Sequence, residues 1–348
     1  MEDTKTLIIG GGVTGMKTAI RLAEMGIKSV IVEKEDALGG KVKNYSRLFP
    51  DFRDSRTLIE ELTANIKSNE NIEIHLGKEV IEATLEDAFK YYITLNSGET
   101  LVVDSIVIAS GFSLFDAGEL PEYGYGVYPN VITSLELENM LAVQEKPILR
   151  LSDNQQAKSF AIVFCVGSRN KRIGNAYCSR ICCSYSIKQA IEIKERIPDA
   201  RVVCFYMDIR TYGRNFEEMY QKAGDMGIKF VRGRVADCSP LANGSIQVRA
   251  ENTLLGKPFQ GIFDIVSLSV GMMPCQDTAQ LKDIFDLPVS KDGFFSIKNE
   301  DHSQHGTSSQ GIFLAGAVSG LKPIRDCLLD ADSVAGQVYS YLSPRGVK

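Results

Sequence analysis

Apolar runs alternate with amphipathic stretches from the start of the chain, and this alternation predicts an α/β fold. The first apolar run, TLIIG, leads through a glycine-rich loop into an amphipathic stretch that ends near Met25, and a second run, SVIVE, follows. A strand, a helix and a strand within about thirty residues make a βαβ unit. Residues 54–68 have the start signal and apolar spacing of another helix. Short alternating segments between Ile72 and Ile108 predict strands and hairpins.

The same alternation begins again in the second half of the chain. The run SFAIVF precedes a helical pattern that ends near Arg196, and the run RVVCFYM follows it. Further segments lead to DIVSLSVG, and the strand pattern GIFLAGAVSG precedes a closing helix. We therefore expect two Rossmann-like lobes, the second inserted into the first. The expected parts are a first domain of residues 1–115 and 272–348, a connecting region of residues 116–157, and an inserted lobe of residues 158–271.

The composition is that of an ordinary globular protein, and it excludes several functional classes. Hydrophobic residues make up 44% and charged residues 24% of the 348 positions. The net charge of −5 offers no basic field for a nucleic-acid backbone, so we expect no nucleic-acid partner. No window approaches 18 consecutive apolar residues, and the first ten residues lack a signal-peptide pattern. We therefore expect no membrane span and a cytoplasmic protein.

The glycine loop after the first strand has the spacing of a dinucleotide-binding turn, Gly10-x-Gly12-x-x-Gly15. The first glycine permits the tight turn, the second lets the backbone approach a pyrophosphate, and the third lets helix and strand pack closely. Backbone N–H groups at the helix start, including those of Val13 and Thr14, can bind phosphate oxygens. Glu33 ends the second strand, where an acidic residue accepts hydrogen bonds from an adenosine ribose. The alternative is a glycine-rich turn without a ligand, which the strand–turn–helix–strand–acid context disfavours.

Three further segments distinguish FAD from NAD, because they resemble motifs of two-lobed flavoproteins. They are EKEDALGGK after Glu33, VIASG at 107–111, and GIFLAGAVSG at 311–320. The last one has Ala317 where many such proteins carry an aspartate that contacts the flavin ribityl chain. We expect FAD, and the candidate residues in these segments and in the turn that follows are Lys34, Gly40, Lys41, Ser110, Gly111, Gly316, Ser319, Lys322 and Ile324.

Half of the eight cysteines lie in one short region, at Cys165, Cys178, Cys182 and Cys183. In a cytoplasmic protein, clustered thiols more often indicate metal or redox chemistry than structural disulfides. On a helix, Cys178 and Cys182 share one face and Cys183 lies about 100° further round. Four converging thiolates suit an iron–sulfur cubane. Buried thiols or a dithiol, and a zinc site, remain alternatives, although adjacent cysteines are awkward around one ion.

The spacing Cys165-x12-Cys178-x3-Cys182-Cys183, in the setting CVGSR…YCSRICCSYSIKQA, resembles the flavin- and cluster-binding A subunit of heterodisulfide reductase. The segments PEYGYGVYPNVITSLELE, FYMDIRTYGRNFEEMYQKA and LSVGMMPC are similar to that family too. The resemblance covers nearly the whole chain. It implies a two-lobed FAD-dependent flavoprotein with a [4Fe–4S] cluster on the four cysteines, Lys188 beside the flavin ring as a catalytic cation, and a homodimer.

Departures from the long methanogen proteins narrow the expected function. The chain lacks their ferredoxin-like modules, and the short form is most similar to the heterodisulfide-reductase-like A subunit of sulfur oxidisers. We therefore expect an electron-transfer oxidoreductase subunit of a multi-protein complex, acting in cytoplasmic sulfur oxidation, with a lipoate-binding protein as a possible sulfur carrier in the pathway. Two alternatives remain: the A subunit of a quinone-interacting oxidoreductase, and a stand-alone NAD(P)H-dependent flavin disulfide reductase that uses Cys178 and Cys182.

Overall fold

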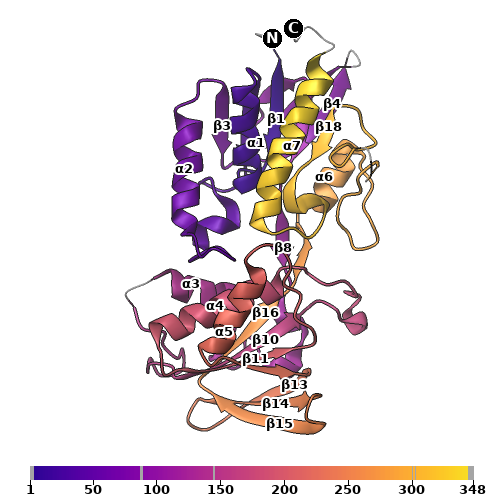
Figure 1. Ribbon diagram of the computed structural model, residues 1–348. Coiled ribbons are helices and arrows are strands. Elements are labelled where there is room, and N and C mark those ends of the chain that lie inside the picture. The colour runs from indigo at the N-terminus through magenta and orange to yellow at the C-terminus, as the bar shows by residue number, and fades with distance from the viewer. Residues whose placement is uncertain (1–3, 87–88, 144–145, 300, 302, 344–348) are drawn as a thin grey trace. The chain divides into compact units, whose positions relative to one another are not determined.

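The computed structural model describes residues 4–86, 89–143, 146–299, 301 and 303–343 and divides the chain into two compact units. Unit 1 comprises Met1–Lys43, Arg56–Ser113 and Met273–Lys348, and unit 2 comprises Asn44–Ser55 and Leu114–Met272. Each unit contains its own five-stranded parallel sheet (Figure 1). Among the described residues, no helix is both long and apolar enough to cross a membrane.

The parallel sheet of unit 1 has the strand order β18-β7-β1-β2-β3. Leu7 pairs with Val30 on one side and with Ile106 on the other, and all three side chains are buried. Helices α1 and α7 lie side by side against this sheet (Figure 1). The bounds are β1 Lys5–Ile9, β2 Lys28–Glu33, β3 Ile72–Leu76, β7 Ser105–Ile108, β18 Ile312–Leu314, α1 Val13–Glu24, α2 Ser55–Lys67 and α7 Ile324–Leu342.

An antiparallel meander completes the core of unit 1. Its strands alternate buried and exposed positions, and Ile93 and Val103 pack under the parallel sheet with Phe285 of α6. Two short 3₁₀ helices carry candidate cofactor residues. The bounds are β4 Val80–Glu86, β5 Lys90–Leu95, β6 Thr100–Val103, α6 Thr278–Phe285, and the 3₁₀ helices η1 Gly40–Asn44 and η5 Gly316–Ser319.

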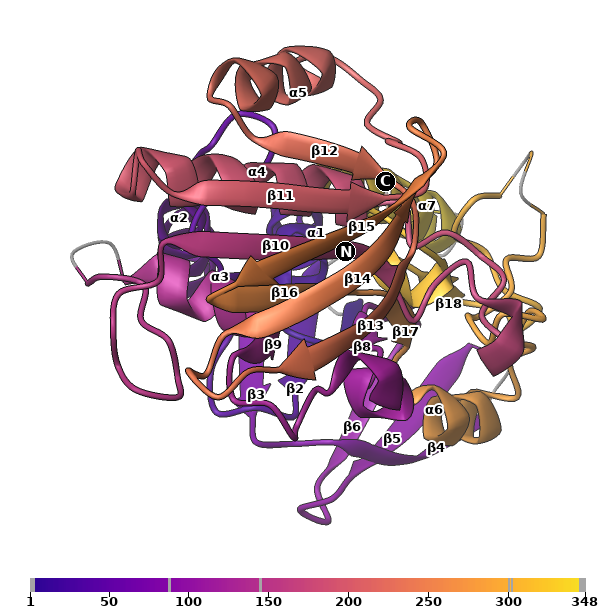
Figure 2. The same ribbon diagram turned by 90° about the horizontal axis from the view of Figure 1, so that it is seen from below.

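The parallel sheet of unit 2 has the order β12-β11-β10-β16-β9, and Figure 2 shows its neighbouring strands running in one direction. Helices α3, α4 and α5 pack against it, and an antiparallel sheet of β13, β14 and β15 adjoins it. The bounds are β9 Val131–Thr133, α3 Ser134–Ala142, β10 Ser159–Val166, α4 Cys182–Arg196, β11 Arg201–Tyr206, α5 Phe216–Asp225, β12 Lys229–Arg232, β13 Val235–Pro240, β14 Ile246–Asn252, β15 Lys257–Phe263 and β16 Ile265–Val270.

Two segments belong to unit 2 although the sequence pattern placed them elsewhere. Residues 116–157, expected to be a connecting region, contribute β9 to the sheet beside β16 and also form α3. The segment Asn44–Ser55 lies within the expected first domain, but it belongs to unit 2. Arg47 within it donates to Glu192 of α4 at 2.7 Å. The chain passes between the units at four places. Two of them lie in β8 Phe112–Leu114 and β17 Met272–Pro274, which pair with each other.

Candidate functional site

The glycine loop of unit 1 has the shape that a bound pyrophosphate requires. Gly10 has φ +110°, and a Cβ there would lie 2.5 Å from the carbonyl oxygen of Ala109. A Cβ on Gly15 would lie 1.9 Å from the carbonyl oxygen of Gly10, so helix and loop touch. A Cβ on Gly12 would meet no atom within 4 Å in the described part of the chain. The backbone at Gly12, which is the N-cap of α1, therefore faces open space where a phosphate can approach.

Glu33 holds this loop from the end of β2. Its carboxylate is buried, and one oxygen accepts a hydrogen bond from the N–H of Gly11 at 2.6 Å. The other oxygen accepts from the N–H of Glu35 at 2.9 Å. A carboxylate has about four lone-pair sites, so each oxygen keeps capacity for a ribose hydroxyl. In the structure, Glu33 therefore fixes the loop.

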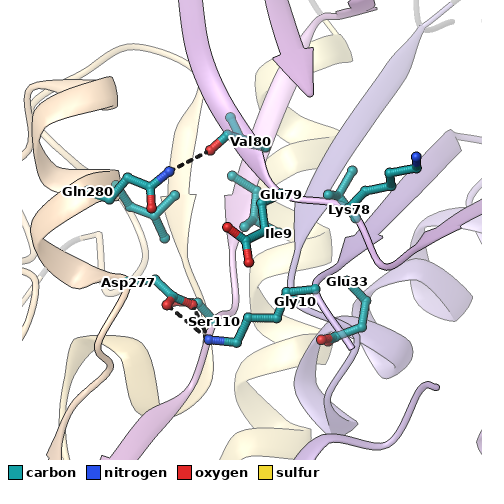
Figure 3. Close-up of a pocket in the computed structure, with 12 residues that line it drawn as sticks. Ile9, Gly10, Glu33, Lys78, Glu79, Val80, Ser110, Asp277 and Gln280 are labelled. Atoms are coloured by element: carbon teal, nitrogen blue, oxygen red, sulfur yellow. Dashed lines mark hydrogen bonds and ion pairs between the residues drawn. The ribbon is translucent and has the colours of Figure 1, made fainter. Parts of the chain in front are cut away.

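A pocket opens beside Glu33, and its residues come from segments that are far apart in the sequence (Figure 3). Gly10, Glu33 and Ser110 line one part of it. The Oγ of Ser110 is buried without a hydrogen-bond partner among the described residues, so it can bind a ligand atom. The remaining lining residues are Ile9, Val32, Lys34, Lys78, Glu79, Val80, Asp277, Gln280 and Leu281.

An ion pair closes one rim of this pocket. The ammonium of Lys34 lies 2.7 Å from the carboxylate of Asp277. Dashed lines mark this interaction at the labelled Asp277 in Figure 3. Burial opposes the charged form of Lys34, but its pKa is raised because hydrogen bonding and Coulomb attraction to Asp277 outweigh that effect. Gln280 donates to the carbonyl oxygen of Val80 at 3.1 Å. Neither Asp277 nor Gln280 belongs to a local motif, and sequence reasoning missed both.

The other predicted cofactor segments of unit 1 adjoin the glycine loop. Gly39 donates its N–H to the carbonyl oxygen of Gly11 at 2.8 Å, and a Cβ on Gly40 would lie 3.2 Å from the Cα of Gly12. A Cβ on Gly316 would lie 2.4 Å from Oγ1 of Thr14. The structure therefore brings together the glycine loop, the Gly-Gly segment and the C-terminal turn. The remaining predicted residues of unit 1 have the following places in the structure. Val13 is the first residue of α1 and Ile324 is the first residue of α7. Gly111 has φ +79°, and the ammonium of Lys41 lies 5.4 Å from the centre of the Phe112 ring.

Asp330 supplies a carboxylate beside the turn in which Ala317 replaces the usual aspartate. Its Oδ2 accepts from the N–H of Gly316 at 3.1 Å and pairs with the ammonium of Lys322 at 2.5 Å. Lys322 also donates to Oγ of Ser319 at 3.1 Å. The predicted residues Ser319 and Lys322 are thus part of one polar cluster. Asp330 was missed because it lies in the second turn of α7, outside any motif.

The four motif cysteines all lie in unit 2. Cys165 is the next-to-last residue of β10, Cys178 lies in the loop that follows, and Cys182 and Cys183 begin α4. Cys178 is partly exposed and the other three are buried. Cys165 has φ +61°, and the pairing of β10 with β16 shifts register between Val163 and Val166. This irregularity places Cys165 in a left-handed conformation that non-glycine residues rarely adopt.

The thiol of Cys182 is hydrogen-bonded to the thiols of Cys165 and Cys183. The pKa of Cys182 is raised well above its ordinary value because its proton is shared with both neighbours, and burial adds to the effect. The hydrogen bond from Cys182 lowers the pKa of Cys183 to about 7, and a hydrogen bond from Cys182 also lowers the pKa of Cys165. The nearby charge of Arg169 contributes in the same direction to both. Three of the four motif sulfurs therefore converge.

Polar donors and strained backbone surround these thiols. Ser168 Oγ and Arg169 Nη1 are buried without a hydrogen-bond partner among the described residues. Arg169 has φ +52° and Arg180 has φ +65°. Strained positions of this kind cluster at functional sites. Within the described ranges, no three His, Cys, Asp or Glu side chains form a group that could hold a single metal ion.

Lys188 lies in unit 2 in a buried polar network. Its ammonium pairs with the carboxylates of Glu138 and Glu192, the latter at 2.9 Å. Ser46 adds hydrogen bonds to both carboxylates, from its N–H to Glu138 at 2.8 Å and from its hydroxyl to Glu192 at 3.0 Å. Gln189 donates to Glu138 at 2.6 Å. The sequence indicated Lys188 as a cation but did not indicate a partner for it. The structure shows that Lys188 is paired with two carboxylates.

The family model for pyridine nucleotide-disulphide oxidoreductases matches residues 4–331. The A subunit of the H(2):CoB-CoM heterodisulfide,ferredoxin reductase of Methanothermobacter thermautotrophicus is 31% identical, over 96% of this chain and 63% of the relative. The iron-sulfur A subunit of the CoB–CoM heterodisulfide reductase of Methanocaldococcus jannaschii is 30% identical, over 97% of this chain and 64% of the relative. The chain thus spans less than two thirds of the length of these relatives.

Solved structures show the same fold at low identity. Thioredoxin reductase of T. acidophilum has a TM-score of 0.67 and 17% identity, covering 98% of this chain and 99% of that one. The Lactococcus lactis enzyme has a TM-score of 0.65 and 18% identity, covering 98% and 100%. The predicted two-lobed α/β fold is thereby confirmed. The chain belongs to the pyridine nucleotide-disulphide oxidoreductase family, and its resemblance to the A subunit of heterodisulfide reductase is confirmed.

Proposed function

We propose that this chain is a FAD- and [4Fe–4S]-containing electron-transfer subunit of a heterodisulfide-reductase-like complex. The observation that carries the proposal is the convergence of Cys165, Cys182 and Cys183 at the start of α4, where a pyridine-nucleotide lobe would have its glycine loop. Bound FAD exchanges electrons in pairs whereas a cluster passes them singly, so a chain that holds both converts one mode of transfer into the other.

In this proposal unit 1 binds FAD through residues that its structure brings together. The open backbone at Gly12 and the first N–H groups of α1 bind the pyrophosphate, and Glu33 accepts from the ribose. Ser110 offers its unpartnered hydroxyl. Lys322, held by Asp330, places a positive charge at the C-terminal turn. Such a charge favours the reduced, anionic form of a flavin.

Unit 2 holds the proposed cluster. Cys165, Cys178, Cys182 and Cys183 are its ligands, and the Ser168 hydroxyl and Arg169 Nη1, both without a partner among the described residues, are donors for its sulfurs. Hydrogen bonds and positive charge near a cluster raise its reduction potential. Arg169 is itself fixed, because its Nη2 donates to the carboxylate of Asp208 at 2.7 Å.

Lys188 remains our candidate for a cation that acts on the flavin. In the structure its ammonium is paired with Glu138 and Glu192. To act on the flavin, the ammonium must therefore leave one of these carboxylates and contact the flavin instead. We then expect Lys188→Met to lower the flavin reduction potential. Lys188→Arg keeps the positive charge, so its flavin reduction potential should stay close to that of the unmodified protein. An unchanged potential in Lys188→Met removes this residue from the flavin site.

The finer parts of the proposal concern the cellular process. We propose cytoplasmic sulfur oxidation, with other complex subunits as partners, a lipoate-binding protein as sulfur carrier, and a homodimer as the assembly. Support for a partnered complex comes from the relatives, which are A subunits of heterodisulfide reductases. The A subunit of a quinone-interacting oxidoreductase is the related alternative. Oxidation of a sulfane-loaded carrier by the reconstituted complex separates the two, because a quinone-linked complex needs a quinone for turnover.

A stand-alone NAD(P)H-dependent disulfide reductase is the second candidate function. The family model favours it, since it describes pyridine nucleotide-disulphide oxidoreductases. In that case Cys178 and Cys182 form the redox-active dithiol. A disulfide reductase of this kind does not require Cys165. The structure nevertheless holds Cys165 in a strained backbone conformation with its thiol hydrogen-bonded to Cys182, which this function leaves unexplained.

The deciding experiment is iron, acid-labile sulfide and FAD per chain, with a visible spectrum, on protein purified without oxygen. The proposal predicts about four iron and four sulfide with one FAD, as a [4Fe–4S] flavoprotein requires. Protein that contains FAD but no iron, and that is bleached by NADH, contradicts it and supports the disulfide reductase.

A further inference from the structure

Three loops of unit 2 gather positive charge around the motif cysteines. They follow β10, β11 and β12, and these strands are parallel neighbours, so the loops leave the same edge of the sheet (Figure 2). Residues 167–180, 207–215 and 232–234 contain eight basic side chains and one acidic side chain, in a chain whose net charge is −5. The basic residues are Arg169, Lys171, Arg172, Arg180, Arg210, Arg214, Arg232 and Arg234.

Ion pairs and hydrogen bonds tie these loops into one surface, which we call the basic rim. Asp208, the single acidic residue, pairs with Arg169 at 2.7 Å and with Arg232 at 3.4 Å. Arg234 donates to the carbonyl oxygen of Arg169 at 3.1 Å. Arg180 stacks on the ring of Tyr212, 5.2 Å from its centroid. The one acidic group is therefore already neutralised inside the rim.

The outward side of the rim is solvated and remains strongly positive. Six of the eight basic residues are exposed, namely Lys171, Arg172, Arg210, Arg214, Arg232 and Arg234. Glu217 and Glu218, in the first turn of α5, border the rim beyond Arg214 and reduce its charge without reversing it. Cys178, the one partly exposed motif cysteine, lies in the first of the three loops. A cluster held by the four cysteines therefore comes nearest to solvent at this surface.

A nucleotide phosphate fits this surface less well than a protein does. At the carboxyl edge of such a sheet a pyrophosphate needs a glycine loop and free N–H groups at the next helix start. Here Cys182 and Cys183 fill the start of α4, and they are only 1% and 2% exposed. The exposed charges are distributed over several loops. Charge spread in this way steers a large anionic partner.

We propose that the basic rim is the docking surface for an acidic redox protein that exchanges single electrons with the cluster at Cys178. This inference rests on the proposed function, because it assigns the route by which electrons reach or leave the [4Fe–4S] cluster. One electron passes in each encounter, so one of the two redox centres is oxidised by one electron and the other is reduced by one electron.

The test uses the full chain with its cofactors and, as probe, an acidic plant-type [2Fe–2S] ferredoxin. Its association rate and its electron-transfer rate are measured at low and high ionic strength. In Lys171→Glu/Arg172→Glu/Arg214→Glu we expect the association rate at low salt to fall by about tenfold or more, with the difference shrinking at high salt. These three side chains lie on the solvated side of the rim, so iron content is expected to stay unchanged.

The matched control reverses three exposed charges at other places on unit 2, Lys158→Glu/Lys229→Glu/Lys257→Glu. Lys158 and Lys229 lie at the amino ends of β10 and β12, the opposite edge of the sheet. The control is expected to keep the association rate within about twofold. Equal losses in both triple variants, or no loss in either, overturn the docking surface.

Two further readouts separate the possible failures. Iron analysis of the unmodified protein tests the proposed function, while ferredoxin association tests the rim whether or not a cluster is present. A protein with a full cluster but no salt-dependent association overturns only the docking proposal. An NADPH titration covers the alternative ligand: if NADPH binding is lost in the rim variant while ferredoxin association is unchanged, the rim is a nucleotide-phosphate site and the proposal is wrong.

Discussion

The ammonium of Lys188 lies 2.9 Å from the carboxylate of Glu192, one turn further along α4, and both side chains are almost fully buried. Glu138 of α3 is the second carboxylate, and Arg47 reaches Glu192 from the segment that joins unit 2 from early in the chain. The buried Lys188, Glu138 and Glu192 thus meet Arg47, which is partly exposed and also pairs with Glu195. Because buried charges are costly without partners, this network joins three separate segments of unit 2.

Removing the lysine should leave two buried carboxylates with one cation. We expect Lys188→Met to lower the free energy of unfolding by about 3–5 kcal/mol, the usual cost of breaking a buried pair. Adding Glu138→Gln to this variant should restore part of the loss, because it removes one uncompensated charge. Urea unfolding measures both. The exposed Lys229→Met serves as the control, and a loss in Lys188→Met no larger than in this control would refute the network's role.

The glycine loop provides two alanine variants with opposite expected effects. Gly12→Ala places its methyl group in open space, so apo stability should stay within about 0.5 kcal/mol while FAD binding is lost. Gly15→Ala forces a methyl group against the carbonyl oxygen of Gly10 and should destabilise the apo protein. Thermal unfolding without FAD and fluorescence titration with FAD separate the two effects. If Gly12→Ala binds FAD normally, the pyrophosphate does not lie there.

Removing a cluster ligand should abolish iron binding without removing the flavin. We expect Cys182→Ala to lose iron and acid-labile sulfide and to keep about one FAD per chain, because unit 1 carries the flavin residues. Cys204→Ala is the matched control: Cys204 is buried in β11, outside the motif, and burial raises its pKa far above the ordinary value. Full iron in Cys182→Ala would remove this residue from the ligand set.

Asp330 should support FAD binding through the turn it holds. Asp330→Asn weakens its bonds to Lys322 and to the N–H of Gly316, so we expect the FAD dissociation constant to rise by about tenfold, equivalent to about 1.4 kcal/mol. Asp332→Asn is the control on the same helix, because Asp332 pairs with Lys17 and Arg21. Equal FAD affinities in the two variants would show that the Asp330 contacts do not reach the cofactor.

His305 should make unit 1 less stable in mild acid. Its ring donates from Nδ1 to the carbonyl oxygen of Leu314 at 2.9 Å, and burial lowers its pKa below the usual 6.5. Below pH 6.5 the unfolded chain therefore binds a proton that the folded chain resists, so stability falls as pH drops from there toward the folded pKa. His305→Gln should flatten this part of the stability curve, measured by urea unfolding between about pH 5 and 7. An unchanged slope would assign the acid sensitivity to other groups.

Much of the site could be predicted because its chemistry is encoded locally. A glycine that must adopt φ +110° or touch a neighbouring carbonyl is recognised from its spacing after a strand, as Gly10 and Gly15 were. The cysteine spacing identified a family whose resemblance the relatives confirm. Strand periodicity likewise placed most elements of both sheets, because backbone period and side-chain burial follow the same short-range pattern.

Contacts between distant segments could not be predicted in this way. Lys34 and Asp277 are 243 positions apart, and nothing in either neighbourhood indicates their pairing. Likewise, no local pattern indicates that Asp330 lies beside the turn where Ala317 lacks a carboxylate.

By itself, the sequence determined the two Rossmann-like lobes, the dinucleotide loop and the four candidate ligands, because short-range spacing and backbone conformation suffice for these. Only the tertiary structure decided that Lys188 is held between Glu138 and Glu192, and that three loops combine into one basic rim. These features depend on which strands lie side by side and which side chains are removed from water. Both depend on how the chain packs. A buried charge is costly unless it is paired, and its partner can come from any segment that folding brings beside it.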